Sequence, residues 1–187
     1  MGYYKSITIY TVNAMKKPTL YILCGLPFSG KTVLTSKLIN VLDLAKVSID
    51  EIKFAHGFTW SEDENMSGED WKKIFSESYD NTREFLIQGR DVIYDSANQD
   101  RASRDRLRAL ASDGDFLTKV IHLDTPFEVI HDRREKNKTL KNRFQLPDRF
   151  FNAAFENYEP PTKDENVITY NDNTEFDSWI KNNFNNV

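Results

Sequence analysis

The sequence predicts an α/β protein of the P-loop NTPase type, in which a parallel sheet carries helices on both faces and a basic lid. Short apolar runs typical of β-strands alternate with helix-like segments along the chain. A complete G-x-x-x-x-G-K-[ST] motif directly follows the first apolar run, at residues 25–32. Basic side chains crowd residues 133–143 of an otherwise acidic chain. A sheet of this kind binds its ligands beyond the carboxyl ends of its strands.

The elements follow one another along the chain. The apolar run Thr19–Cys24 predicts a strand, and apolar residues at helical spacing after the glycine-rich motif predict a helix over Lys31–Leu42. Pro126 fits the first turn of a later helix, and Pro147 precedes a further helix with core-facing aromatic residues. The other predicted strands are Lys46–Ile49, Val92–Tyr94, Thr118–Leu123 and Val167–Tyr170. The other predicted helices are Gly68–Gln88, Arg101–Ser112, Pro126–Arg134 and Glu175–Phe184.

Length and composition favour one compact domain. The chain has 187 residues, of which 39% are hydrophobic, and this is enough apolar material for a single core. We expect the domain to span 19–187, after an N-terminal extension, 1–18, in which Ile7–Val12 could add an edge strand. No run of 18 apolar residues and no secretory signal pattern occur, so we expect a cytoplasmic protein without a membrane span.

The glycine-rich motif predicts a site for a nucleoside triphosphate. Its glycines let backbone N–H groups curl around phosphates, Lys31 neutralises the β- and γ-phosphate oxygens, and the Thr32 hydroxyl binds Mg²⁺. We therefore expect ATP and Mg²⁺ as cofactors. The residues predicted to hold the nucleotide are Gly25, Leu26, Pro27, Phe28, Ser29, Gly30, Lys31, Thr32 and Val33.

Two carboxylates end predicted strands, where such a sheet delivers its chemistry. Asp50 ends the second strand and Asp95 ends the third. Phosphoryl transfer needs a carboxylate that accepts the proton of the acceptor hydroxyl, and often another that holds Mg²⁺. We assign the first role to Asp50 and the second to Asp95. Capping of a following helix is the alternative for each.

The basic segment predicts a lid over the phosphates. Arg133, Arg134, Lys136, Lys138, Lys141 and Arg143 are opposed there only by Glu135. Such a concentration of charge would stabilise a transferring phosphoryl group, and we assign a catalytic role to Arg133 and Arg134. A solvated basic helix face is the alternative.

Aromatic residues follow Asp50 in the run Phe54–Trp60. They could stack a base, a sugar or an aromatic ring in the acceptor pocket, or they could pack against the long helix at Gly68–Gln88. His56 within this run is expected to be an ordinary surface or packing histidine.

Composition argues against several other functions. A net charge of −4 opposes bulk binding to nucleic acid. Cys24 is the only cysteine, which excludes a disulfide within the chain and cysteine-based metal sites. The three histidines lack ligand-like spacing.

The order of motifs from about Thr19 to Thr162 resembles the P-loop kinases that are similar to the kinase domain of polynucleotide 5′-hydroxyl kinase, often described as AAA-type ATP-binding proteins. The matching residues are Asp50 with Lys53, Asp95-Ser96-Ala97-Asn98, Arg104, Pro126 with Arg133, and Pro147. The resemblance implies that Asp50 is the general base and that Lys53, Asn98 and Arg104 bind substrate. One departure is Asn137, which replaces the second arginine of the family's lid. Its duty could pass to Arg134, Lys136 or Lys138.

Two functions of different class remain. In the first, an ATP-dependent kinase moves the γ-phosphoryl group to a hydroxyl of a small molecule or of a nucleic-acid 5′ end. The architecture also resembles zeta-type toxins and chloramphenicol phosphotransferases, which leaves the acceptor open. In the second, a nucleotide-binding regulatory NTPase signals its bound state to a partner. A monomer or a dimer is expected in either case.

Overall fold

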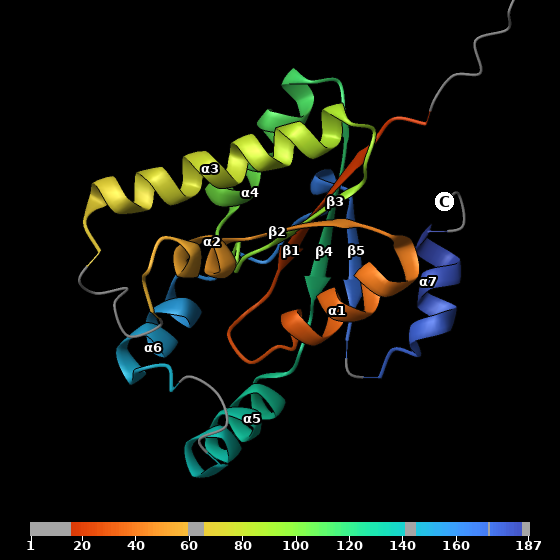
Figure 1. The fold of residues 1–187 in the computed structure, drawn as a ribbon. Helices are drawn as coiled ribbons and strands as arrows, with labels where there is room; N and C mark the ends of the chain where they lie inside the picture. Colours follow the sequence, from red (N-terminus) through yellow and green to blue (C-terminus); the bar gives the residue numbers. More distant parts are fainter. Residues whose placement is uncertain (1–15, 60–65, 141–144, 172, 185–187) are drawn as a thin grey trace, which may run out of the picture.

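The computed structural model describes residues 16–59, 66–140, 145–171 and 173–184. They form a parallel sheet in the order β2-β3-β1-β4-β5 (Figure 1). The central strand β1 therefore has β3 on one side and β4 on the other, and the loop after β1 leaves the middle of the sheet. The strands are β1 (Thr19–Cys24), β2 (Ala45–Ser48), β3 (Val92–Asp95), β4 (Leu117–Leu123) and β5 (Val167–Tyr170).

Helices cover both faces of this sheet, as predicted. Alternate residues of β1 point to opposite faces, as the twofold period of a strand requires. Leu20 and Ile22 belong to the core beneath α3 and α4, whereas Tyr21 and Leu23 belong to the core beneath α1 and α7. The helices are α1 (Lys31–Leu42), α2 (Ile49–Ala55), α3 (Gly68–Ile87), α4 (Arg101–Asp113), α5 (Phe127–Leu140), α6 (Asp148–Glu156) and α7 (Phe176–Phe184).

The second strand ends earlier than predicted. β2 stops at Ser48, and Asp50 lies in the first turn of α2, so the prediction that Asp50 ends the strand was wrong. Ser48 is the N-cap of α2 and its hydroxyl accepts a hydrogen bond from the Glu51 N–H at 3.4 Å. Two carboxylates in the first turn also favour the helix, because they face its positive end.

The basic helix is longer than predicted. α5 continues past Arg134 to Leu140, because no glycine or proline interrupts it. α5 and α6 lie beyond the carboxyl ends of the strands, at the same end of the molecule as the start of α1 (Figure 1). Of the predicted lid residues, Arg133, Arg134, Lys136 and Lys138 lie on α5, whereas Lys141 and Arg143 lie outside the described residues.

Other predictions also fall outside the described residues. The candidate edge strand Ile7–Val12 and the aromatic Trp60 belong to this group. The division into 1–18 and 19–187 stays a prediction. Within the described residues, no helix is both long and apolar enough to cross a bilayer.

Candidate active site

The glycine-rich loop needs its glycines for two different reasons. A Cβ atom on Gly25 would lie 2.9 Å from Ser29 Oγ and 3.1 Å from Leu123 Cβ, so a side chain there would push the loop off the sheet. Gly30 has φ +105°, which L side chains rarely adopt, and α1 begins directly after it. Phe28 also takes a positive φ of 64°. The loop is therefore held in a tight curl between β1 and α1.

The start of α1 suits an anion. No residue in the described part of the chain caps this helix with a side chain, and its first turn contains no acidic residue. Its free N–H groups and the positive end of the helix dipole thus face the space in front of the loop. The Ser29 hydroxyl is buried and bonds to none of the described residues. These donors fit the phosphates of ATP.

Lys31 folds back over the loop. Its Nζ donates hydrogen bonds to the carbonyl oxygens of Gly25, at 2.7 Å, and Leu26, at 2.9 Å. Burial lowers the pKa of Lys31 to about 8, although the negative charges of Asp95 and Asp50 oppose this shift. Both carboxylates therefore lie close enough to Lys31 to raise its pKa. A bound phosphate, which carries more negative charge, would stabilise the charged ammonium further.

Asp95 and Thr32 are the residues that would hold Mg²⁺. Asp95 ends β3 beside the P-loop strand, and Thr32 is exposed at the start of α1. Burial raises the pKa of Asp95, whereas the charges of Lys46 and Lys31 lower it. A divalent cation would favour the ionised carboxylate further. Helix α4 is capped by Asp100, which accepts from Ser103 N–H at 2.7 Å, so Asp95 does not serve as its cap.

Asp50 projects from α2, which Ser48 caps, so capping does not explain this carboxylate either. Its Oδ1 lies 3.9 Å from Lys53 Nζ, one turn along the same helix. Lys53 is only 1% exposed, and its ammonium lies 5.4 Å from the centre of the Trp71 ring on α3. Lys53 is thus enclosed between two helices. This location favours a role in which Lys53 positions Asp50 over one in which it contacts a substrate.

The two lid arginines do different things. Arg133 Nη1 donates to the carbonyl oxygens of Phe28 and Ser29, at 3.2 Å and 3.0 Å, so it lies against the P-loop. The Arg134 side chain is buried instead: its guanidinium stacks 4.0 Å from the centre of the Phe151 ring and pairs with Asp148. Arg133 can reach a phosphate, whereas Arg134 joins α5 to α6. Asn137, which replaces the family's second arginine, is also buried.

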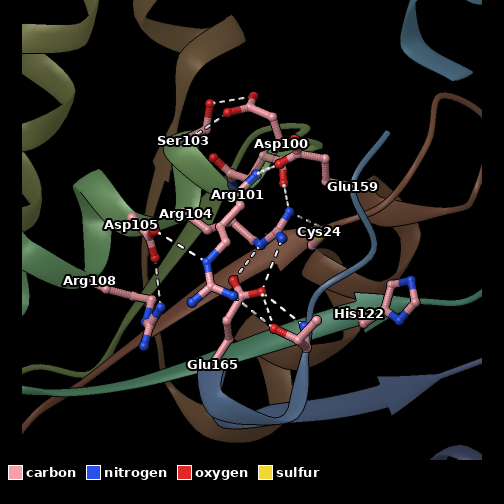
Figure 2. Close-up of polar contacts among 12 residues, drawn as sticks. Cys24, Asp100, Arg101, Ser103, Arg104, Asp105, Arg108, His122, Glu159 and Glu165 are labelled. Carbon is pink, nitrogen blue, oxygen red and sulfur yellow. Dashed lines mark hydrogen bonds and ion pairs between the residues drawn. The ribbon is translucent and has the colours of Figure 1, made fainter. Parts of the chain in front are cut away.

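Arg104 is held in a buried ion pair. Its Nε and Nη2 donate to the two carboxylate oxygens of Glu165, at 2.7 Å and 3.1 Å, and both side chains are fully buried. Figure 2 shows Arg104 reaching from α4 to the turn before β5 that carries Glu165, and passing near Cys24. This geometry gives no support to the prediction that Arg104 contacts substrate.

Asn98 ties the loop after β3 to the P-loop strand. Its Nδ2 donates to the Leu23 carbonyl at 2.7 Å, and the adjacent Ala97 carbonyl accepts from Gly25 N–H at 3.3 Å. Asn98 itself is buried. Its amide therefore anchors the loop, and the contact supports a structural role.

A cavity of about 240 Å³ opens between α3 and α4, beside the loop after β3. The sequence analysis missed its aromatic wall, which consists of Phe75, Tyr79 and Tyr94. The sequence did contain a signal for this wall, because Trp71, Phe75 and Tyr79 are spaced four residues apart and therefore share one face of α3. Of the run expected near the acceptor, Phe54 is exposed and Phe58 packs on the core. A larger cavity, about 560 Å³, lies at the amino ends of β4 and β5, whereas the P-loop follows the carboxyl end of β1.

The fold and the family are supported by comparison with known proteins. A protein from Chloroflexus aurantiacus, described as a kinase, is 20% identical and superposes with a TM-score of 0.71 over 90% of this chain and 100% of its own. Kti12 from Chaetomium thermophilum, solved with ADP-AlF3, is 19% identical with a TM-score of 0.69 over 89% of this chain and 96% of its own.

A chain of the Pnkp1/Rnl/Hen1 RNA repair complex is 19% identical, with a TM-score of 0.60 over 80% of this chain and 49% of its own. These likenesses confirm a P-loop kinase-like fold. A search of curated protein sequences found no significant match. The sequence profile of AAA_33, described as an AAA domain, matches residues 20–161. Because this match spans most of the chain, the protein belongs to the AAA_33 family of AAA domains, with a P-loop kinase-like fold.

Proposed function

We propose that the protein is an ATP-dependent phosphotransferase that moves the γ-phosphoryl group of ATP to a hydroxyl of its acceptor. The observation that carries this proposal is that Asp50 and Asp95 both act on the charge of Lys31 at the N-terminus of α1. Among the described residues, no side chain caps this end of α1. A P-loop that only binds a nucleotide needs the lysine and a metal-binding carboxylate. The second carboxylate, on α2, is the additional group that transfer to a hydroxyl requires.

Each residue has a distinct role in this proposal. When bound, MgATP supplies the γ-phosphoryl group, which leaves ADP and joins the acceptor oxygen. Lys31 and the N–H groups of the loop bind the phosphates, and Thr32 and Asp95 hold Mg²⁺. Asp50 accepts the proton of the acceptor hydroxyl, with Lys53 beside it. Arg133, already against the P-loop, steadies the charge of the transferring group.

The decisive experiment compares two neighbouring carboxylates. The pure protein is incubated with Mg²⁺ and γ-labelled ATP against 5′-hydroxyl oligonucleotides, nucleosides, sugars, and aminoglycoside or phenicol drugs. We expect Asp50→Asn to lower transfer by about two or more orders of magnitude while MgATP binding is kept. The matched control is Glu51→Gln, which removes an exposed carboxylate that pairs with Lys46. Transfer that is undiminished in Asp50→Asn removes Asp50 as the base.

A regulatory NTPase remains the second candidate, supported by the likeness of the fold to Kti12. It predicts tight MgATP binding without label on any acceptor, and an Asp50→Asn variant that hydrolyses ATP at the parental rate. The acceptor is proposed to be a small molecule or a nucleic-acid 5′ end, and the transfer assay distinguishes the two. The protein is proposed to be a monomer or a dimer, which light scattering measures.

A further inference from the structure

The cavity between α3 and α4 has one aromatic wall and one polar wall. Tyr94 is almost fully buried at the end of β3, and the rings of Tyr79 and Phe75 follow it along α3. The Tyr79 and Tyr94 rings lie 6.4 Å apart at an interplanar angle of 25°, and those of Phe75 and Tyr79 lie 6.2 Å apart at 30°. Phe75 keeps 37% of its surface exposed. The three rings therefore lie at small angles to one another along one side of an open cavity.

The polar wall has free hydrogen-bonding capacity. Ser96 and Gln99 line the cavity from the loop after β3. Throughout the described residues, no hydrogen bond occupies the Ser96 hydroxyl, the Gln99 side-chain amide or the Tyr79 hydroxyl. By contrast, the Tyr94 hydroxyl already bonds to Ser78 Oγ at 2.8 Å. A planar ring with polar atoms at its edge matches both walls. Such a ring can stack on the aromatic wall and form hydrogen bonds with the polar wall.

The cavity adjoins the phosphate site. Its polar wall includes Ala97, whose carbonyl accepts from the N–H of Gly25 at the start of the P-loop. The same loop begins directly after Asp95. On α3, Trp71 stacks 5.8 Å from Phe75 and covers Lys53, which lies beside Asp50. A ring in the cavity therefore lies next to both the predicted metal ligand and the residues around the predicted base.

We propose that this cavity binds a planar ring with a polar edge that belongs to the phosphoryl acceptor, so that a hydroxyl carried by the ring's substituent faces the P-loop. This inference rests on the proposed function and adds a substrate class to it. A volume of about 240 Å³ is below the roughly 300–1,000 Å³ of sites for drug-sized ligands, so it accommodates a single ring and excludes a stack of bases. A nucleoside and a hydroxylated arene share the required chemistry.

The test measures binding first, with the nucleotide site filled. The protein is saturated with Mg²⁺ and a non-hydrolysable ATP analogue, and adenosine, uridine, a phenicol and the ring-free polyols ribose and glycerol are titrated by calorimetry. We expect the ring compounds to bind more tightly than the polyols. Because base–aromatic stacking is worth about 1–3 kcal/mol, Tyr79→Ala should weaken the binding of ring compounds by roughly 5- to 150-fold.

Two further variants keep the result interpretable. Phe85→Ala removes an aromatic ring from the same helix outside the cavity and should change affinity by less than about twofold. Gln99→Ala removes a cavity amide from a loop and should also weaken ring binding. It tests the site even if Tyr79→Ala fails to fold. Ring binding that neither Tyr79→Ala nor Gln99→Ala alters overturns the inference, as does a protein that binds only polyols.

Phosphoryl transfer, measured on the same panel with MgATP, separates this inference from the proposed function. Transfer to ring compounds that depends on Tyr79 supports both. Transfer to polyols alone keeps the kinase and overturns the ring-binding site. Ring binding that depends on Tyr79, with no transfer to any acceptor, keeps the site and overturns the kinase.

Discussion

At the scale of single residues, Lys31 shows how burial prepares a charge for its ligand. In the free protein its ammonium is satisfied by two carbonyl oxygens, which carry only partial charge. Burial lowers its pKa to about 8, so part of the population is neutral near physiological pH. A triphosphate supplies the full negative charge that the site lacks, and binding should therefore restore the charged form.

This predicts a pH-dependent nucleotide affinity. Below about pH 8, Lys31 is already charged and affinity should be constant; above it, binding must take up a proton, so affinity should fall by up to about tenfold per pH unit. Calorimetry in buffers of different ionisation enthalpy would detect the proton uptake. Lys31→Met should bind weakly and lose this dependence. An affinity that stays level from neutral pH to about pH 10 would contradict the prediction.

Arg104 and Glu165 illustrate the opposite case, in which buried charge serves structure. Burial alone would raise the pKa of Glu165, but the hydrogen bonds from Arg104 and from the Thr162 N–H leave it below its usual range. The pair therefore stabilises the folded protein above pH 4.5, the ordinary value, and this contribution is lost as pH falls through the lowered pKa.

Removal of one partner should be costly. Glu165→Leu leaves Arg104 buried without its carboxylate and should lower the free energy of unfolding by about 3–5 kcal/mol. The double variant Arg104→Met with Glu165→Leu should lose less than Glu165→Leu alone, because no charge stays buried. Urea denaturation measures both. If the single and double variants lost the same amount, the burial of an unpaired charge would not be the cause.

At the scale of elements, α5 and α6 act together through Arg134. The guanidinium lies on the Phe151 ring and pairs with Asp148 at the start of α6, and the two helices also meet where the Phe127 ring lies 5.2 Å from the Phe155 ring. Arg133, the preceding residue, points to the P-loop instead. Arg134 therefore links the two helices, whereas Arg133 is the arginine to which the proposed function gives a role in transfer.

The two arginines should separate in experiment. Arg134→Ala should lower the free energy of unfolding by about 1–2 kcal/mol, because it loses a cation–π contact and an ion pair. Arg133→Ala should leave stability within about 0.5 kcal/mol but lower phosphoryl transfer by at least tenfold. Thermal unfolding and the labelled-ATP assay provide the two readings. Normal turnover in both variants would refute the role of the basic helix in transfer.

α2 is the element that the sequence analysis missed, although its signal was present. Ser48-Ile49-Asp50-Glu51 has the S-x-x-E spacing of a helix start, and the structure caps the helix with Ser48. The apolar run that ends in Ile49 predicts a strand instead, because a short run does not distinguish a strand end from a helix start. The alternation of strands and helices and the long helix α3 were predictable, since they rest on the local pattern of apolar residues.

At the scale of the whole molecule, the strand order explains why the candidate site forms where it does. β1 lies at the centre, β3 and β2 on one side, and β4 and β5 on the other. The ends of β1 and β3, with the start of α2, bring Lys31, Asp95 and Asp50 to the carboxyl end of the sheet. α5, which follows β4 in the chain, brings Arg133 to the same end of the sheet, against the P-loop.

The sequence by itself determined the P-loop, the α/β alternation and the place of Asp95 at the end of a strand, because each depends on neighbouring residues and on a local period. Only the tertiary structure decided which arginines form ion pairs with distant carboxylates. Arg104 pairs with Glu165, 61 residues away, and Arg134 pairs with Asp148, 14 residues away. The cavity between α3 and α4 likewise needs both helices on one face. Such pairings arise from packing between distant segments, which no local pattern encodes.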